Sequence, residues 1–153
     1  MTNAPATDDA ALQGLALVLG LATDEIFGAA DPAQARGFFR AVGGRLAALY
    51  PIPSMRDLRE LQGAVNAAWQ RVGLGEAQIT LDLQGVLIHH HNAPAAIPGD
   101  PDRRWAEVMP ALLVGAYDGW LRAIGSPETL VTRVVAQSEG LVEIRHGADI
   151  LNR

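Results

Sequence analysis

Three consecutive histidines, His89, His90 and His91, are the residues whose type and spacing come closest to a chemical site. On a strand, side chains alternate between the two faces, so His89 and His91 would share one face. His146, on another predicted strand, could join them as a nitrogen-rich metal site. The favoured alternative is that three imidazoles end an exposed edge strand, because a metal site also needs groups that orient its ligands. We therefore expect no resident metal.

Residues for other kinds of catalysis are scarce in this chain. Its serines, Ser54, Ser126 and Ser138, fit a helix cap, a loop and a turn, and none lies in a strand–turn–helix elbow. Asp57 and Glu60 could act as paired carboxylates in glycoside hydrolysis, but they are more simply ion-pair partners of neighbouring arginines on a helix. With no cysteine and no phosphate-binding glycine motif after a strand, we expect neither an enzyme nor a bound cofactor.

Aromatic side chains offer a third kind of chemistry, the binding of sugars. Tyr117 and Trp120 are three residues apart in a predicted helix and therefore share one face. An exposed pair of this kind could stack on a glycan. Packing in the core or in an interface is the favoured alternative, because large aromatic side chains are usually buried.

The composition of the 153-residue chain is that of one globular domain, with 49% hydrophobic and 19% charged residues. The net charge is −5 and the isoelectric point is near 5.2. Both values disfavour nucleic acid and anionic membranes as partners, because neither attracts an acidic protein. We expect residues 1–8 to be a flexible N-terminal segment and residues 9–153 to be a single domain.

The first 35 residues hold five carboxylates and no basic side chain, so they carry the whole charge imbalance. Between the acids, residues 10–22 form an apolar run within a helix predicted over residues 9–27. This run is shorter than the roughly 20 residues of a membrane span, and aspartates precede it where a secretion signal has basic residues. We therefore expect a cytoplasmic protein, with the periplasm as the alternative that stays open, whose own fold, or another copy of it, covers this helix. The expected interface residues are Leu12, Leu15, Leu17, Val18, Leu19 and Leu21.

The remaining sequence predicts further helices and two hairpins. Asp31 and Pro32 are an N-cap and first-turn pair that begins a helix over residues 32–49, and Ser54 is expected to cap the next helix, which runs to residue 72. Alternating apolar residues then predict a hairpin of residues 79–83 and 86–91, with a turn at Gln84-Gly85 and a loop over residues 92–102. The next helix runs through residues 112–124, with Pro110 as a kink or as its true first turn.

A second hairpin of residues 130–136 and 141–146 completes the chain. The order is three N-terminal helices, a β-hairpin, a helix and a β-hairpin. It predicts an α+β fold with helices on one face of a small antiparallel sheet. Gly37, Gly43 and Gly44 would weaken the second helix, so we expect another backbone to approach it closely there.

Several segments together resemble the D-subunit family of bacterial cellulose synthase. The clearest is Gly115-Ala116-Tyr117-Asp118-Gly119-Trp120, followed ten residues later by Leu130-Val131-Thr132-Arg133. Further matches occur upstream in the same order, and the similarity covers about residues 38–146. These matches are Val42-Gly43, Pro51-x-Pro53, Leu58, Leu61, Asn66, Gly73-x-Gly75 and Asn92-Ala93-Pro94.

The resemblance implies a non-catalytic accessory subunit of a bacterial cellulose synthase complex. It implies a homo-octamer, built as a tetramer of dimers, that organises the export and packing of β-1,4-glucan chains. N-terminal segments would line glucan passageways inside the ring, so Thr2, Asn3 and Thr7 become candidate glucan contacts beside Tyr117 and Trp120. The implied partners are the inner-membrane synthase complex and a proline-rich accessory protein of the same operon.

Two alternatives remain open at this point. Dedicated secretion chaperones are also small, acidic, cysteine-free α/β proteins with a hydrophobic groove, but they are dimers. An enzyme or metal-binding domain would instead have to be built on His89, His91 and His146.

Overall fold

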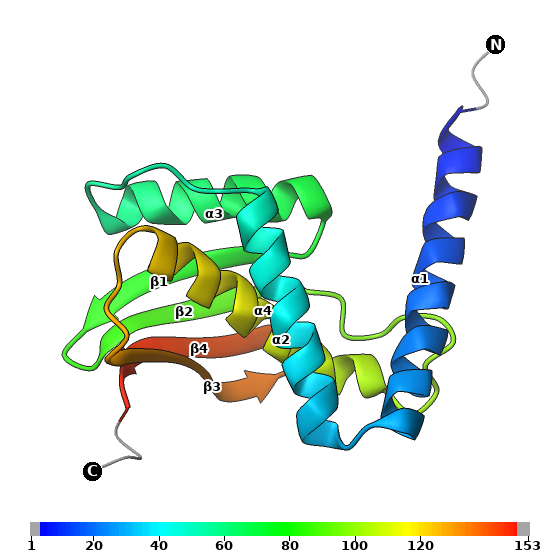
Figure 1. The fold of residues 1–153 in the computed structure, drawn as a ribbon. Coiled ribbons are helices and arrows are strands. Elements are labelled where there is room, and N and C mark those ends of the chain that lie inside the picture. The colour runs from blue at the N-terminus through cyan, green and yellow to red at the C-terminus, as the bar shows by residue number, and fades with distance from the viewer. Residues whose placement is uncertain (1–3, 150–153) are drawn as a thin grey trace.

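The computed structural model describes residues 4–149, with side chains from residue 8 onward. Over this range the chain forms four helices and one antiparallel sheet of four strands, in the predicted order (Figure 1). The α+β fold class is therefore confirmed. The helices are α1 (Ala4–Ala29), α2 (Pro32–Leu49), α3 (Leu58–Val72) and α4 (Arg104–Ala123); the strands are β1 (Glu76–Asp82), β2 (Gly85–His91), β3 (Leu130–Ser138) and β4 (Leu141–Ala148).

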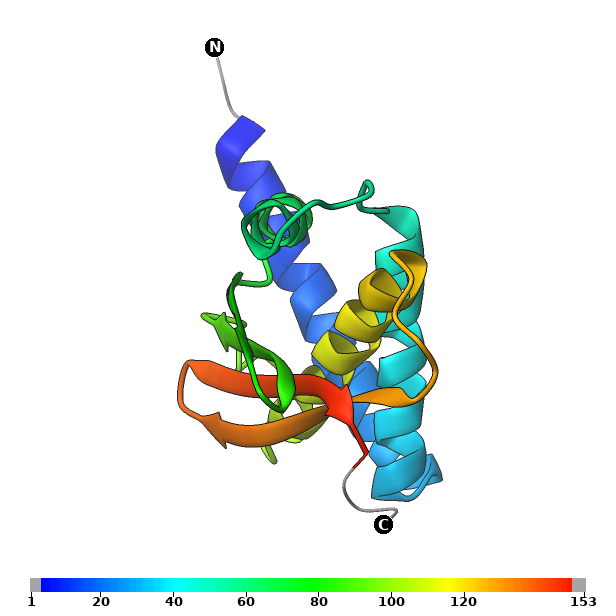
Figure 2. The same cartoon turned by 90° about the vertical axis from the view of Figure 1, so that its left-hand side faces the viewer.

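The sheet has the strand order β1-β2-β4-β3, so both hairpins pair internally and β2 joins β4. Figure 2 shows α3 and α4 on one side of this sheet, with α2 on the far side of α4. The inward face of the sheet follows the period-two pattern. Its buried residues are Ala77, Ile79, Ile88, His90, Thr132, Val142, Ile144 and His146.

The starts of α2 and α3 show how local hydrogen bonds set helix boundaries. Asp31 caps α2 as predicted, because its carboxylate accepts from the Gln34 N–H at 2.8 Å and the Gln34 side chain accepts from the Asp31 N–H. The predicted Ser54 cap is wrong. Asp57 caps α3 instead, accepting from the Glu60 N–H at 2.9 Å, and the Glu60 carboxylate accepts from the Arg56 N–H. An aspartate with a glutamate three residues later satisfies two free donors at once.

Of the two places predicted for Pro110, a kink within the helix and the first turn, the first turn is wrong, because Pro110 lies inside α4. The helix begins earlier because the Asp100 carboxylate accepts from the N–H groups of Arg104 and Trp105, at 2.8 and 2.9 Å. Proline has no N–H to give to the carbonyl four residues before it. The side-chain amide of Gln137 on β3 donates to that carbonyl, on Ala106, at 3.2 Å.

Two glycines allow α2 and α4 to cross with their backbones in contact. A Cβ atom at Gly43 would lie 1.9 Å from the Leu112 carbonyl oxygen, and one at Gly115 would lie 1.9 Å from the Arg40 carbonyl oxygen. The expected close approach is confirmed at Gly43. A Cβ atom at Gly119 of α4 would lie 3.8 Å from the Gly44 backbone, so α4 also approaches Gly44, whereas a Cβ atom at Gly37 would have nothing within 4 Å and the prediction is wrong there.

Helix α1 is longer than predicted, since it begins at Ala4 and continues to Ala29. Much of the segment expected to be flexible, residues 1–8, is therefore helical, and residues 1–3 lie outside the described part of the chain.

Candidate functional site

Helix α1 is attached to the rest of the molecule only along its C-terminal half (Figure 1). A Cβ atom at Gly20 would lie 2.0 Å from the Pro98 carbonyl oxygen, so the helix backbone rests directly on the loop before α4. The Thr23 side chain is fully buried and its hydroxyl donates to the Leu19 carbonyl at 2.7 Å. The Arg104 guanidinium lies 4.8 Å from the centre of the Phe27 ring. These contacts fix the direction in which α1 projects.

The projecting part of α1 exposes large apolar side chains. Five of the six residues expected at an interface, Leu12, Leu15, Leu17, Val18 and Leu21, are between 42% and 67% exposed. The sixth, Leu19, packs against the chain's own core. Leu12, Leu19 and Ile26 are seven residues apart and lie on one stripe of the helix. That stripe is covered where α1 meets the body of the protein and uncovered beyond it.

The apolar part of helix α1 is longer than the run of residues 10–22 that the sequence indicated. The helical segment Asp8–Ala29 has 22 residues and is long and apolar enough to cross a membrane by length and composition. An apolar helix face of this kind requires a cover, which lipid or another protein chain can supply.

Among the residues expected to contact glucan, the structure describes the side chains of Tyr117 and Trp120. Tyr117 and Trp120 are each 1% exposed, so neither ring presents a face to a sugar, and core packing is the outcome. Thr2 and Asn3 lie outside the described residues, and only the backbone of Thr7, within α1, is described.

Tyr117 instead belongs to a buried hydrogen-bond network that the sequence analysis missed. The Trp69 indole N–H donates to the Tyr117 hydroxyl at 2.9 Å. The Tyr117 hydroxyl lies 2.6 Å from Nδ1 of His90, and Nε2 of His90 lies 2.7 Å from the Leu74 carbonyl. Since a carbonyl can only accept, the His90 proton is on Nε2, and Nδ1 accepts from the Tyr117 hydroxyl. Each side-chain polar group in this network thus has a partner.

This network makes the stability of the fold sensitive to acid. Burial, with a smaller contribution from the neighbouring His91, lowers the pKa of His90 from 6.5 to about 4, although the hydrogen bond to Leu74 acts in the opposite direction. Burial and then Arg122 also lower the pKa of His146, against the effect of Asp118. Between pH 6.5 and about 4 the unfolded chain binds a proton at His90 and the folded chain does not, so the stability that His90 contributes is complete above pH 6.5 and is lost as the pH falls toward 4.

We expect the His90 contribution to lower the free energy of unfolding by about 3 kcal/mol between pH 7 and pH 4. Denaturant unfolding at several pH values in this range measures how steeply the free energy of unfolding depends on pH. His90→Gln should flatten this dependence, whereas His89→Gln, on the opposite face of the same strand, is the matched control. An unchanged slope in His90→Gln would show that other groups cause the acid sensitivity.

The histidines that could have formed a metal site are separated by the sheet. His89 and His91 lie on its outer face, with ring centres 6.5 Å apart, and His89 Nε2 is 3.3 Å from the Glu143 carboxylate. His146 is on the inner face, and both its ring nitrogens have hydrogen-bond partners. The alternative in which His146 joins the other two is therefore excluded, and the favoured prediction of an exposed edge strand is wrong, because β2 lies between β1 and β4 and His90 is buried. Within residues 4–149, no three potential ligands among His, Asp and Glu come together.

His146 lies instead in a second buried network, which includes a serine that the sequence analysis assigned only to a loop. Thr132 donates to the Asp118 carboxylate at 2.8 Å, so its oxygen accepts from Nδ1 of His146 at 2.7 Å. Nε2 of His146 then accepts from the Ser126 hydroxyl. This order of protons resembles that of an activated serine. Ser126 lies in the turn that ends α4, where the network ties that turn to β3 and β4.

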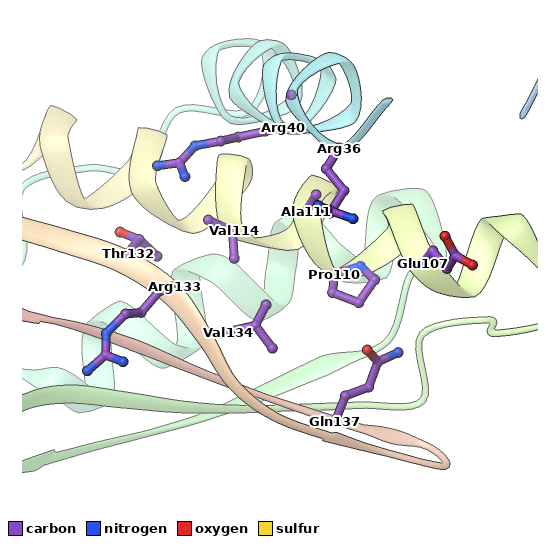
Figure 3. A pocket seen from close by; sticks show the side chains of 11 residues that line it. Arg36, Arg40, Glu107, Pro110, Ala111, Val114, Thr132, Arg133, Val134 and Gln137 are labelled. Carbon is purple, nitrogen blue, oxygen red and sulfur yellow. The ribbon is translucent and has the colours of Figure 1, made fainter. Parts of the chain in front are cut away.

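A groove of about 500 Å³ lies between α2, α4 and β3 (Figure 3). Arg36 and Arg40 of α2 form one wall, and Thr132 and Val134 of β3 form the other. Pro110, Ala111 and Val114 of α4 form the apolar floor. The sequence did not indicate this groove, because its walls come from segments about 95 residues apart that only the fold brings together.

Comparison with known proteins identifies the family of the chain. The family model for the D subunit of cellulose synthase matches residues 8–147 of the 153-residue chain. The chain matches none of the curated proteins with which it was compared. The family match includes nearly all of α1, the sheet and the helices that cover it. The chain therefore belongs to the cellulose synthase D-subunit family, and its role is that of an accessory subunit in cellulose synthesis.

Proposed function

We propose that this protein is a non-catalytic scaffold that assembles as a homo-octamer, a tetramer of dimers, and organises the export and packing of β-1,4-glucan chains. The single observation that carries the proposal is the exposed apolar face of α1. The buried groups that could have suggested catalysis, His90, Tyr117 and His146, are engaged in hydrogen bonds that support the fold.

Energetics favours another copy of this chain as the cover of α1. Fully burying one Leu or Val side chain contributes about 1.5–3 kcal/mol, and five such side chains are roughly half exposed on α1. Covering them therefore contributes several kcal/mol to association. Homo-oligomers place the same patch at repeated symmetric contacts, so one apolar helix can serve every copy.

The partners of this scaffold follow from its place in cellulose synthesis. Family membership places the chain with the cellulose synthase complex. We propose that it acts on the cytoplasmic side of the inner-membrane synthase, together with a proline-rich accessory protein. In this proposal glucan passes the N-terminal segments of the ring, at Thr2, Asn3 and Thr7.

The mass of the assembly tests the proposal. Light scattering should find eight 16.2-kDa chains for the unaltered protein and a smaller assembly for Leu15→Asp. An aspartate buried without a partner in an apolar contact costs several kcal/mol. Leu83→Asp is the matched control, because Leu83 is fully exposed in the β1–β2 turn, and this variant should keep the mass of the unaltered protein.

Other masses would contradict the proposal in distinct ways. A stable monomer, or a Leu15→Asp variant that keeps its full mass, would show that α1 is not at the contact. A protein of two chains would favour the dimeric secretion chaperone. Flotation with vesicles that Leu15→Asp abolishes, without any change of mass, would show that a bilayer covers α1.

A further inference from the structure

The two edges of the sheet differ in how their backbone groups are satisfied. At the β1 edge, the Asn66 side chain of α3 both donates to the Ala77 carbonyl at 3.0 Å and accepts from the Ala77 N–H at 2.7 Å. The Gln62 side chain accepts from the Ile79 N–H at 2.9 Å. Side chains of α3 thus occupy the places that an added strand would take, so this edge is protected.

At the β3 edge, the outward backbone groups can be identified from the pairing. Leu130 donates its N–H to the Pro127 carbonyl at 3.1 Å, and its carbonyl accepts from the Arg122 side chain. The N–H and C=O groups of Leu130 therefore point away from β4. Because this direction alternates along an antiparallel strand, the N–H and C=O groups of Thr132 and Val134 point away from β4 as well.

The register across the whole sheet gives the same result independently. The backbone groups of Ala77 and Ile79 point away from β2, because side chains of α3 bond to them. The residues opposite them on β2, His90 and Ile88, therefore direct their own N–H and C=O groups toward β4. Ile88 is opposite Ile144, and Ile144 is opposite Val134. Val134 must then direct its backbone groups outward. Within residues 4–149, no side chain or loop bonds to those groups, and beyond Val134 a bulge interrupts the ladder.

The free part of this edge opens into the groove between β3 and α2. Thr132 and Val134 line it, and Val134 is exposed. The side chains of Arg36 and Arg40 lie across from them on α2, above the apolar floor provided by α4 (Figure 3). A strand edge beside a helix with an apolar floor is the geometry in which domains add an extended peptide as a further strand.

The charge of the groove indicates the kind of peptide. Arg36 and Arg40 are exposed, and among residues 4–149 no carboxylate lies within salt-bridge distance of either guanidinium. The one acid of the groove wall, Glu107, is paired with Arg104 at 3.5 Å. Guanidinium groups bind carboxylates through paired, charge-assisted hydrogen bonds. The groove therefore combines a backbone template with the two unpaired positive charges that α2 contributes.

We propose that this groove binds an extended acidic segment of a partner protein, which pairs with Val134, the exposed residue of the free β3 edge, while its carboxylates bind Arg36 and Arg40. The acidic α1 of a second copy does not fit this description, because it is helical and offers no free backbone groups. The proposed site is separate from the apolar face of α1 and does not depend on the assembly argued above.

Fluorescence anisotropy with a labelled peptide that alternates glutamate with valine tests the proposal. The unaltered protein should bind it, and should bind the lysine–valine counterpart more weakly. Reversing both charges, Arg36→Glu with Arg40→Glu, should weaken binding by at least about tenfold, which corresponds to 1.4 kcal/mol. Arg45→Glu is the matched control, because Arg45 is exposed on the same helix and does not line the groove.

A backbone variant separates strand addition from simple attraction of anions. Val134→Pro removes an outward N–H that the sheet itself does not use, so an edge strand tolerates the change, and it should reduce binding as much as the charge reversal. Circular dichroism confirms that the variant is folded. Binding that survives Val134→Pro, or competition by neutral cellulose oligosaccharides, would overturn the proposal. A change of mass in light scattering of Val134→Pro would also overturn it, because a second copy would then occupy the edge.

Discussion

Replacing Trp120 by alanine is expected to lower the free energy of unfolding by about 3–5 kcal/mol, the cost of removing a large aromatic side chain from a packed core. Trp120 is 1% exposed. Its ring centre lies 5.2 Å from that of Trp69 and 5.8 Å from that of Tyr117, in edge-to-face arrangements. Its indole N–H donates to the Tyr50 carbonyl at 2.9 Å, which ties α4 to the end of α2. Truncation would leave a cavity and an unpaired carbonyl.

Denaturant unfolding at a fixed protein concentration measures this change, since assembly would otherwise alter the apparent stability. Trp120→Phe is the matched control, because it keeps an aromatic ring in the cavity and loses only the donor to Tyr50. It should recover part of the loss. Unchanged unfolding together with disordered cellulose would mean that Trp120 contacts glucan and is not a core residue.

Replacing Tyr117 by phenylalanine should be almost as costly, although it removes one oxygen atom. The hydroxyl is the acceptor for the Trp69 indole and the donor to Nδ1 of His90. Without it two buried polar groups have no partner, at about 1–3 kcal/mol each. We therefore expect a loss of about 2–6 kcal/mol in the free energy of unfolding. Burial also raises the pKa of Tyr117, so the hydroxyl remains protonated throughout the measurement.

The chain contains its own control for this experiment. Tyr50, the other tyrosine, keeps its hydroxyl free of hydrogen bonds to any described residue, and Arg71 lies 5.9 Å from its ring centre. Tyr50→Phe removes the same atom while retaining the ring, so stability should stay nearly constant. Equal losses in the two variants would show that the loss reflects something other than the buried network.

Helix boundaries illustrate where local signals succeed and where they fail. The aspartate and proline at residues 31–32 predicted the start of α2, because a cap is formed by residues within one turn of each other. Ser54 looked like an equally good cap, yet Asp57 and Glu60 together satisfy more donors and begin the helix three residues later. The sequence left Pro110 between the interior and the first turn of the helix, because its compensating partner, Gln137, lies on a distant strand.

The sequence by itself determined the order of helices and strands, the apolar character of α1 and the family resemblance. These depend on periodicity and on motifs that extend over a few neighbouring residues. Tertiary structure alone decided that Tyr117 joins a buried network with Trp69 and His90, that His146 lies across the sheet from His89, and that β3 keeps a free edge beside two arginines of α2. Each of these results depends on contacts between residues distant in the chain. Such contacts are set by how whole elements pack and pair, and no local pattern of residues records that.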